Sequence, residues 1–182
     1  MSCGCNENGA PSETVAVVRD KHLKVEFLYL DEAPCSGTAQ ALNKAVEVVT
    51  PVLETMGLSL SVEKIHVVDK KLAIAKGFLA SPTIRVNGKD IDPARTEDDC
   101  PSCGSLTGDK VSVSCRTWHW QDEVFQAAPV GKIIEEIMVA ALLKSIAFEN
   151  CCVLSEAEVE YSLPENLDRF FAARASDQRL GC

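Results

Sequence analysis

Alternation of apolar and polar residues predicts four strands in the first half of the chain. Residues 23–30 alternate with the period of two that is typical of a half-buried strand, and residues 58–68 repeat the pattern. A third run, residues 81–88, ends in Asn87-Gly88, which is the strongest short signal for a β-hairpin turn. The returning strand is therefore expected over residues 89–92.

Apolar residues three or four positions apart predict the helices. The clearest pattern lies between Ser36 and Gly57, where such residues mark one helical face and Pro51 is expected to introduce a kink. Weaker helical patterns cover residues 69–79, 130–148 and 163–173. The order strand, helix, strand, helix, hairpin, helix implies partly parallel strand pairing with right-handed crossovers. The sequence therefore predicts a layered α/β fold.

The segment between the hairpin and the last long helix has a different character. Residues 93–110 are rich in Asp, Gly, Ser and Pro and show no regular pattern, whereas residues 111–120 alternate as one strand. Gln121-Asp122 is expected to turn this strand into a second hairpin that ends near Gln126. We interpret residues 93–126 as an insertion that carries a cysteine-containing loop and a hairpin.

These patterns give one domain with two appended segments. Residues 15–148 form the expected domain, and residues 1–14 a flexible tail that carries cysteines. Residues 149–182 form a polar C-terminal tail that contains the short helix.

Composition and charge narrow the range of possible functions. A formal net charge of -9 without a basic patch argues against nucleic-acid binding. No stretch reaches the roughly 18 apolar residues of a membrane span, and the N-terminal segment lacks the apolar core of a signal peptide, so we expect a cytoplasmic protein. Nine cysteines in such a protein indicate metal or redox chemistry rather than structural disulfides.

Cys35 is the first candidate for this chemistry. It lies between the strand at residues 23–30 and the helix that begins near Ser36. Unpaired N–H groups and the helix dipole at this position favour negative charge, which lowers the pKa of a thiol. The alternative is a small buried residue that closes a strand–helix turn.

The same elements carry a resemblance to the thioredoxin superfamily. A strand that ends in a cysteine, a helix containing a proline and a later Ser-Pro-Thr that opens a hairpin resemble that fold over residues 23–92 and 130–148. The resemblance implies a thioredoxin-like fold in which Cys35 is the attacking cysteine and Pro82, in the cis form, faces it. Thioredoxins carry a second cysteine three positions later, where this chain has Thr38. Its hydroxyl could donate to a thiolate, but it cannot form a disulfide.

More narrowly, the chain resembles a small prokaryotic family of thioredoxin-fold proteins that has no assigned activity. The resemblance rests on Cys35-Ser-Gly-Thr38, residues 81–88, Cys115-Arg-Thr-Trp118 and residues 163–171. It supports the fold and implies no particular reaction.

A second group of cysteines lies in the insertion. Cys100-Pro-Ser-Cys103 suits a metal knuckle, and Cys115 completes a set of three thiolates that would bind Zn(II), As(III) or Hg(II). With His119 the set would become a tetrahedral Cys3His zinc site. On one continuous strand, however, His119 would lie about 13 Å from Cys115, too far for both to bind one ion without a bend. The competing interpretation is a redox disulfide between Cys100 and Cys103. The terminal cysteines have no assigned role; they are Cys3, Cys5, Cys151, Cys152 and Cys182.

Three functions follow from these residues. The favoured one is thiol-dependent redox or thiol-exchange chemistry with a partner protein or a small thiol. It uses Cys35 as the nucleophile, with Cys100 or Cys103 as a candidate resolving thiol. A fully buried Cys35 with an ordinary pKa would rule it out. The first rival is non-enzymatic soft-metal or metalloid binding by the cysteine loop, and the second is a catalytically silent scaffold that binds partners.

Overall fold

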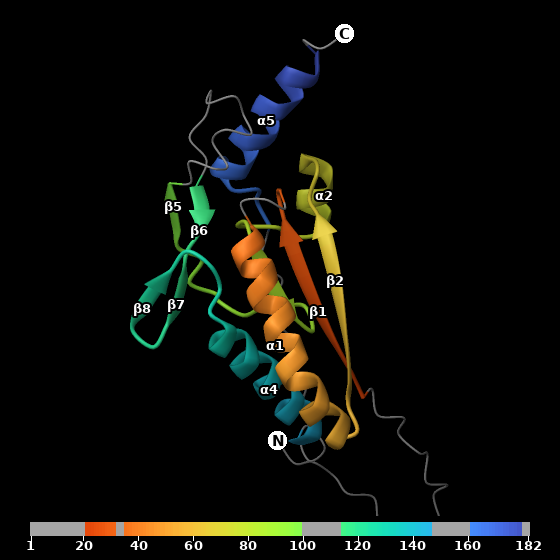
Figure 1. Ribbon diagram of the computed structural model, residues 1–182. Coiled ribbons are helices and arrows are strands. Elements are labelled where there is room, and N and C mark those ends of the chain that lie inside the picture. The colour runs from red at the N-terminus through yellow and green to blue at the C-terminus, as the bar shows by residue number, and fades with distance from the viewer. Residues whose placement is uncertain (1–20, 32–34, 100–113, 147–160, 180–182) are drawn as a thin grey trace, which may run out of the picture.

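A computed structural model describes residues 21–31, 35–99, 114–146 and 161–179 (Figure 1). Its main sheet has the strand order β2-β1-β3-β4. The pairing of β1 with β2 is parallel, and β1–β3 and β3–β4 are antiparallel. The strands of this sheet are β1 (His22–Tyr29), β2 (Ser59–His66), β3 (Thr83–Val86) and β4 (Lys89–Asp90). The predicted mixed α/β architecture is therefore confirmed.

The helices of the described residues are α1 (Ser36–Thr55), α2 (Lys70–Ala75), α4 (Val130–Ile146) and α5 (Glu165–Arg179). In Figure 1, α1 and α4 lie together against one face of the main sheet. None of these helices is both long enough and apolar enough to cross a membrane.

Strand β1 supplies both faces of the core, because successive side chains of a strand point to opposite sides. Leu23, Val25 and Phe27 are buried against α1 and α4. Leu28 and Leu30 are buried in a second apolar cluster that includes residues of α2 and α5. Near its C-terminal end, β1 therefore packs against one apolar cluster on each side.

Helix α5 closes that second cluster. Its side chains Leu167 and Phe170 are fully buried, and Phe171 is 7% exposed. The C-terminal segment was predicted to hold a short amphipathic helix, and the structure shows that this helix folds back onto the core.

The insertion differs from its predicted form. Residues 97–99, expected to lack regular structure, form β5 (Glu97–Asp99), which pairs antiparallel with β6 (Ser114–Arg116). The single strand expected over residues 111–120 is also wrong, since Thr117 separates β6 from β7 (Trp118–Trp120), which belongs to another sheet. Residues 111–113 lie outside the described part of the chain.

The second predicted hairpin is confirmed. Strand β7 pairs with β8 (Glu123–Phe125). The turn residues Gln121 and Asp122 have φ values of 51° and 62°. The Asn87-Gly88 turn between β3 and β4 is equally left-handed, with φ values of 50° and 83°. Both turns show the positive φ that two-residue hairpins require.

Candidate functional site around Cys35

Cys35 lies at the first turn of α1, as the sequence predicted. Its carbonyl accepts the first helical hydrogen bond, from Ala39 N at 3.0 Å, while its side chain does not cap the helix. The thiol is therefore held near the N–H end of α1, where the helix dipole favours negative charge.

Ser81 contacts this thiol from a distant part of the chain. Its Oγ lies 3.7 Å from Cys35 Sγ. The same oxygen accepts a hydrogen bond from Leu30 N at 3.2 Å, so the hydroxyl hydrogen remains available for the sulfur. The Ser81 carbonyl accepts from Arg116 N at 2.8 Å. Ser81 thus joins the end of β1, the start of α1 and strand β6.

Pro82 follows Ser81 through a cis peptide bond and is buried. It stands one residue from the hydroxyl that contacts Cys35. Thr83 comes next, and its Oγ1 donates to the Ala80 carbonyl at 2.7 Å, which closes the turn around Ser81-Pro82. The Ser81-Pro-Thr83 segment is therefore a compact loop beside the thiol.

The first turn of α1 is fixed from the other side by the segment before α4. Thr38 is 2% exposed, and its Oγ1 accepts a hydrogen bond from Ala128 N at 3.2 Å. A Cβ added at Gly37 would lie 3.1 Å from the Cβ of Ala127, so a larger residue here would have to push Ala127 away by a few tenths of an ångström. The Thr38 hydroxyl thus anchors the chain ahead of α4, and its expected role as a partner of the thiolate stays a prediction.

The site is closed to solvent. Cys35 is 2% exposed and Ser81 is 1% exposed. Residues 32–34, which precede Cys35, lie outside the described residues. A partner molecule can reach the sulfur only when the surrounding chain moves.

The cysteines of the insertion are described only in part. Cys115 lies in β6 opposite Asp98 and packs against the second apolar cluster, half-buried. Cys100 and Cys103 fall outside the described residues, as do the five terminal cysteines. Within the described ranges, no group of three or more His, Cys, Asp or Glu residues is placed to hold a metal ion. The predicted Cys100, Cys103 and Cys115 set therefore stays a prediction. Cys115 and His119, expected on one strand face, belong to separate sheets.

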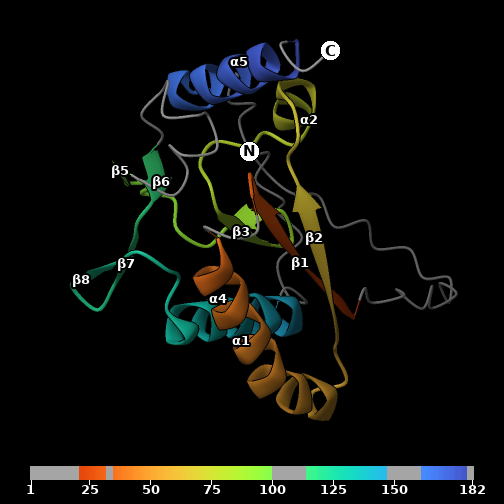
Figure 2. The same cartoon turned by 45° about the horizontal axis from the view of Figure 1, so that its top comes forward.

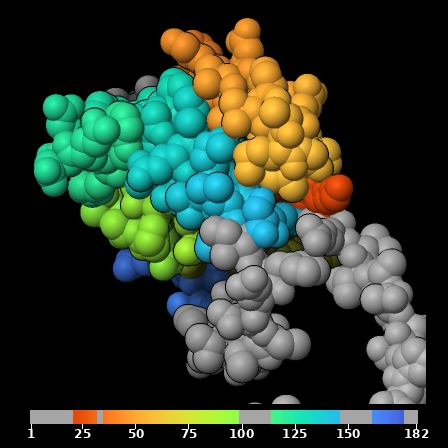
Figure 3. All heavy atoms as spheres, turned by 90° about the horizontal axis from the view of Figure 1, so that it is seen from below, coloured from red at the N-terminus to blue at the C-terminus, as the bar shows by residue number. Residues whose placement is uncertain are grey.

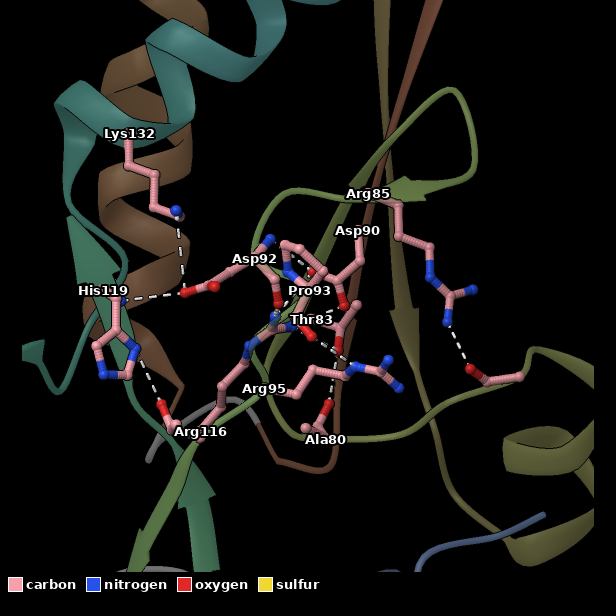
Figure 4. Close-up of polar contacts among 12 residues, drawn as sticks. Ala80, Thr83, Arg85, Asp90, Asp92, Pro93, Arg95, Arg116, His119 and Lys132 are labelled. Atoms are coloured by element: carbon pink, nitrogen blue, oxygen red, sulfur yellow. Dashed lines mark hydrogen bonds and ion pairs between the residues drawn. The ribbon is translucent and has the colours of Figure 1, made fainter. Parts of the chain in front are cut away.

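Arg116 is the main residue near this site that sequence reasoning missed. Its side chain is completely buried, and its guanidinium binds both carboxylate oxygens of Asp90, at 2.8 and 3.0 Å (Figure 4). It also donates to the Asp92 carbonyl and to Thr83 Oγ1, and it stacks 4.4 Å from the centroid of the Trp118 ring. Arg116 therefore joins the insertion to the loop that carries Ser81 and Pro82.

Asp92 extends this network toward α4. Its carboxylate accepts from His119 N at 3.1 Å and lies 4.0 Å from Lys132 Nζ (Figure 4). Asp92 is 3% exposed, so its charge is balanced by these partners rather than by water.

Nothing in the alternation of residues 111–120 distinguishes a buried arginine at position 116 from a surface one. The only sequence signal was its place in the Cys115-Arg-Thr-Trp118 motif.

Together these features define an α/β protein in which a buried cysteine at a helix start faces a cis-proline loop. The chain belongs to the family described as "Domain of unknown function (DUF2703)", which matches residues 23–137, more than half of its length. The matched region includes Cys35, Ser81, Pro82 and Arg116. No curated protein and no solved structure matches the chain.

Proposed function

We propose that this protein is a thioredoxin-like thiol protein that exchanges thiols and disulfides through Cys35. The observation that carries the proposal is the position of the Cys35 sulfur, at the N-terminus of α1 and 3.7 Å from the Ser81 hydroxyl. A helix N-terminus and a hydroxyl donor both stabilise a thiolate, which is the reactive form of the thiol. The adjacent cis-Pro82 loop supports the thioredoxin-like assignment.

The proposed step is a balanced exchange. The Cys35 thiolate attacks one sulfur of a partner disulfide, a Cys35–partner disulfide forms, and the other partner sulfur leaves as a thiolate. A second thiol then attacks the mixed disulfide and releases Cys35, so no external oxidant is consumed. Because Thr38 occupies the position of a resolving cysteine, that second thiol is external or comes from Cys100 or Cys103.

Because the Cys35 thiol is buried, the chain around it must open before exchange can occur. The thiol is 2% exposed, so the exchange rate is limited by movement of the chain around it. Such gating favours small disulfides over folded partners. It also protects the thiolate from oxidation between turnovers.

The test treats the reduced full-length chain with oxidised glutathione as a small disulfide probe. Intact mass and peptide mapping then locate each adduct. We expect an adduct at Cys35 in the folded protein, and we expect iodoacetamide to alkylate Cys35 without unfolding. Cys35→Ser should abolish this adduct, whereas Cys115→Ser should leave it unchanged. A Cys35 that reacts only after unfolding would overturn the proposal and leave the silent-scaffold function.

A second candidate, soft-metal binding, is supported by the strand pairing of the insertion. Cys115 lies opposite Asp98, two positions before Cys100 in the sequence. Native mass spectrometry with Zn(II) or As(III) tests it. Retention of the metal at unchanged stoichiometry in the Cys100→Ser, Cys103→Ser double variant would refute this function.

A further inference from the structure

A cavity of about 580 Å³ lies between the end of β2, helix α2 and helix α5. In both Figure 1 and Figure 2, α2 and α5 lie beside each other at the same end of the main sheet. The cavity is within the size range of small-molecule sites. Its lining includes His66, Val68, Lys71, Phe171 and Arg174.

The charged lining is mainly cationic, although the whole chain carries a formal net charge of -9. Asp69 uses its carboxylate to cap α2, accepting from Leu72 N at 2.7 Å. Lys70 forms an ion pair with Asp168. Among the side chains that the structure describes, Lys71 and Arg174 have no ion-pair partner. The Lys71 ammonium and the Arg174 guanidinium, which lies 5.7 Å from the centroid of the Phe170 ring, therefore place two positive charges at the cavity.

The remaining lining is apolar and aromatic. Phe171 is 7% exposed and forms part of the second apolar cluster, while Val68, which also lines the cavity, is 56% exposed. The alanines at positions 172 and 175 add small apolar surface from α5. An apolar wall next to cationic side chains is the combination that binds an organic anion with an apolar body.

His66 adds one oriented polar group. Its ring stacks on Tyr29, with centroids 5.3 Å apart and planes 8° apart. Its Nε2 donates to the Leu30 carbonyl at 2.9 Å, because a carbonyl only accepts. The stacking and the hydrogen bond therefore fix the imidazole ring at the cavity.

We propose that this cavity binds a small organic anion, a carboxylate or a phosphate ester, that carries an apolar ring or chain. Lys71 and Arg174 contact the anionic group, and Phe171 and Val68 contact the apolar body. The proposal goes beyond the thiol exchange assigned to Cys35 and needs none of the cysteines.

The test uses three probes of nearly equal shape on the full-length chain. 1-Naphthylacetate carries a carboxylate, 1-naphthyl phosphate a phosphate, and 1-naphthylacetamide no charge. Naphthalene fluorescence or calorimetry gives the dissociation constants. We expect at least one anion to bind about tenfold or more tightly than the amide, which corresponds to about 1.4 kcal/mol. The preferred anion distinguishes a carboxylate ligand from a phosphate ester.

The matched variants are Lys71→Gln with Arg174→Gln, and Lys44→Gln on α1 as the control. The double variant should lose the preference for the anion and keep amide binding, and the control should bind all probes as the wild type does. Equal affinity for all three probes would overturn the proposal. So would an unchanged preference in the double variant, or no binding of either anion below about 1 mM.

Discussion

The indole of Trp120 lies directly on the backbone of Gly131. A Cβ built at Gly131 would come within 2.5 Å of Cζ2 of Trp120. The indole Nε1 also donates to Glu135 Oε2 at 3.0 Å, one turn further along α4. In Figure 3, the green β7–β8 hairpin adjoins the start of α4 on this face of the molecule. A missing side chain therefore allows the hairpin to dock on the helix.

Gly131→Ala should displace Trp120. We expect a loss of about 1–3 kcal/mol in unfolding free energy from the clash, partly offset by about 1 kcal/mol of helix propensity. In a Trp120→Ala background the same change should be neutral or stabilising. Urea unfolding of the four proteins gives the coupling energy. An identical effect of Gly131→Ala in both backgrounds would show that the contact does not constrain the fold.

Arg116→Met should be among the most destabilising changes in the described chain. It removes both hydrogen bonds to Asp90 and leaves that carboxylate, whose side chain is 21% exposed, without its cation. The expected cost is about 3 kcal/mol, at the lower end for a broken buried pair. Arg95→Met is the matched control, because among the described residues the exposed Arg95 side chain bonds only to the nearby Pro93 carbonyl. Equal melting temperatures for the two variants would refute a structural role for the network. Arg116→Lys keeps the charge without the bidentate geometry, so it should give an intermediate loss.

Ser81→Ala should affect both stability and the thiol. The Leu30 N–H would lose its buried acceptor, which costs about 1–3 kcal/mol. The Cys35 sulfur would also lose its hydroxyl donor, so the alkylation rate should reach half its maximum at a higher pH than in the wild type. Ser162→Ala, at an exposed serine, is the control for both measurements. An unchanged pH profile of alkylation would mean that Ser81 only supports the backbone.

Tyr161→Phe should reveal a pH-dependent contribution of the Tyr161 hydroxyl to the free energy of unfolding. The Tyr161 hydroxyl donates to the Phe78 carbonyl at 2.8 Å, and burial raises the pKa of this phenol above its usual value of 10. The folded state therefore favours the protonated phenol. This stabilisation is complete below the unfolded pKa and is lost as pH rises through the higher folded pKa.

At neutral pH we expect Tyr161→Phe to cost about 1 kcal/mol, with a difference from wild type that shrinks above about pH 10. Tyr29→Phe is the control, since no hydrogen bond joins its hydroxyl to the described residues. A difference that stays constant into alkaline solution would contradict the role of the phenol proton.

The sequence predicted those elements whose local pattern agrees with their place in the fold. Strand β1 alternates because Leu23, Val25 and Phe27 meet an apolar cluster while Lys24, on the other side, is exposed, and the Asn87-Gly88 turn has the residues that positive φ requires. Strand β5 was missed because Glu97-Asp-Asp99 has no apolar period, and it is a strand only through its pairing with β6.

At the candidate site, features set by residues close together in the sequence could be predicted, but contacts between residues far apart in the sequence could not. The position of Cys35 at the start of α1 follows from a strand pattern that precedes a helix pattern. The contact with Ser81 joins residues 46 positions apart, and no periodicity records it. Burial of the Arg116 charge likewise depends on Asp90 and Asp92, which lie in another part of the chain. Such contacts are set by tertiary packing, which overrides local preference.

The pairing of Asp99 with Ser114 brings together the two ends of the segment that carries Cys100 and Cys103. The entropic cost of closing a loop grows only with the logarithm of its length. A shorter connection between β5 and β6 would therefore change this cost little. Replacing this segment with a short turn should therefore leave the stability of the fold almost unchanged. A chain shortened in this way would separate the chemistry of the insertion from that of Cys35 within one scaffold.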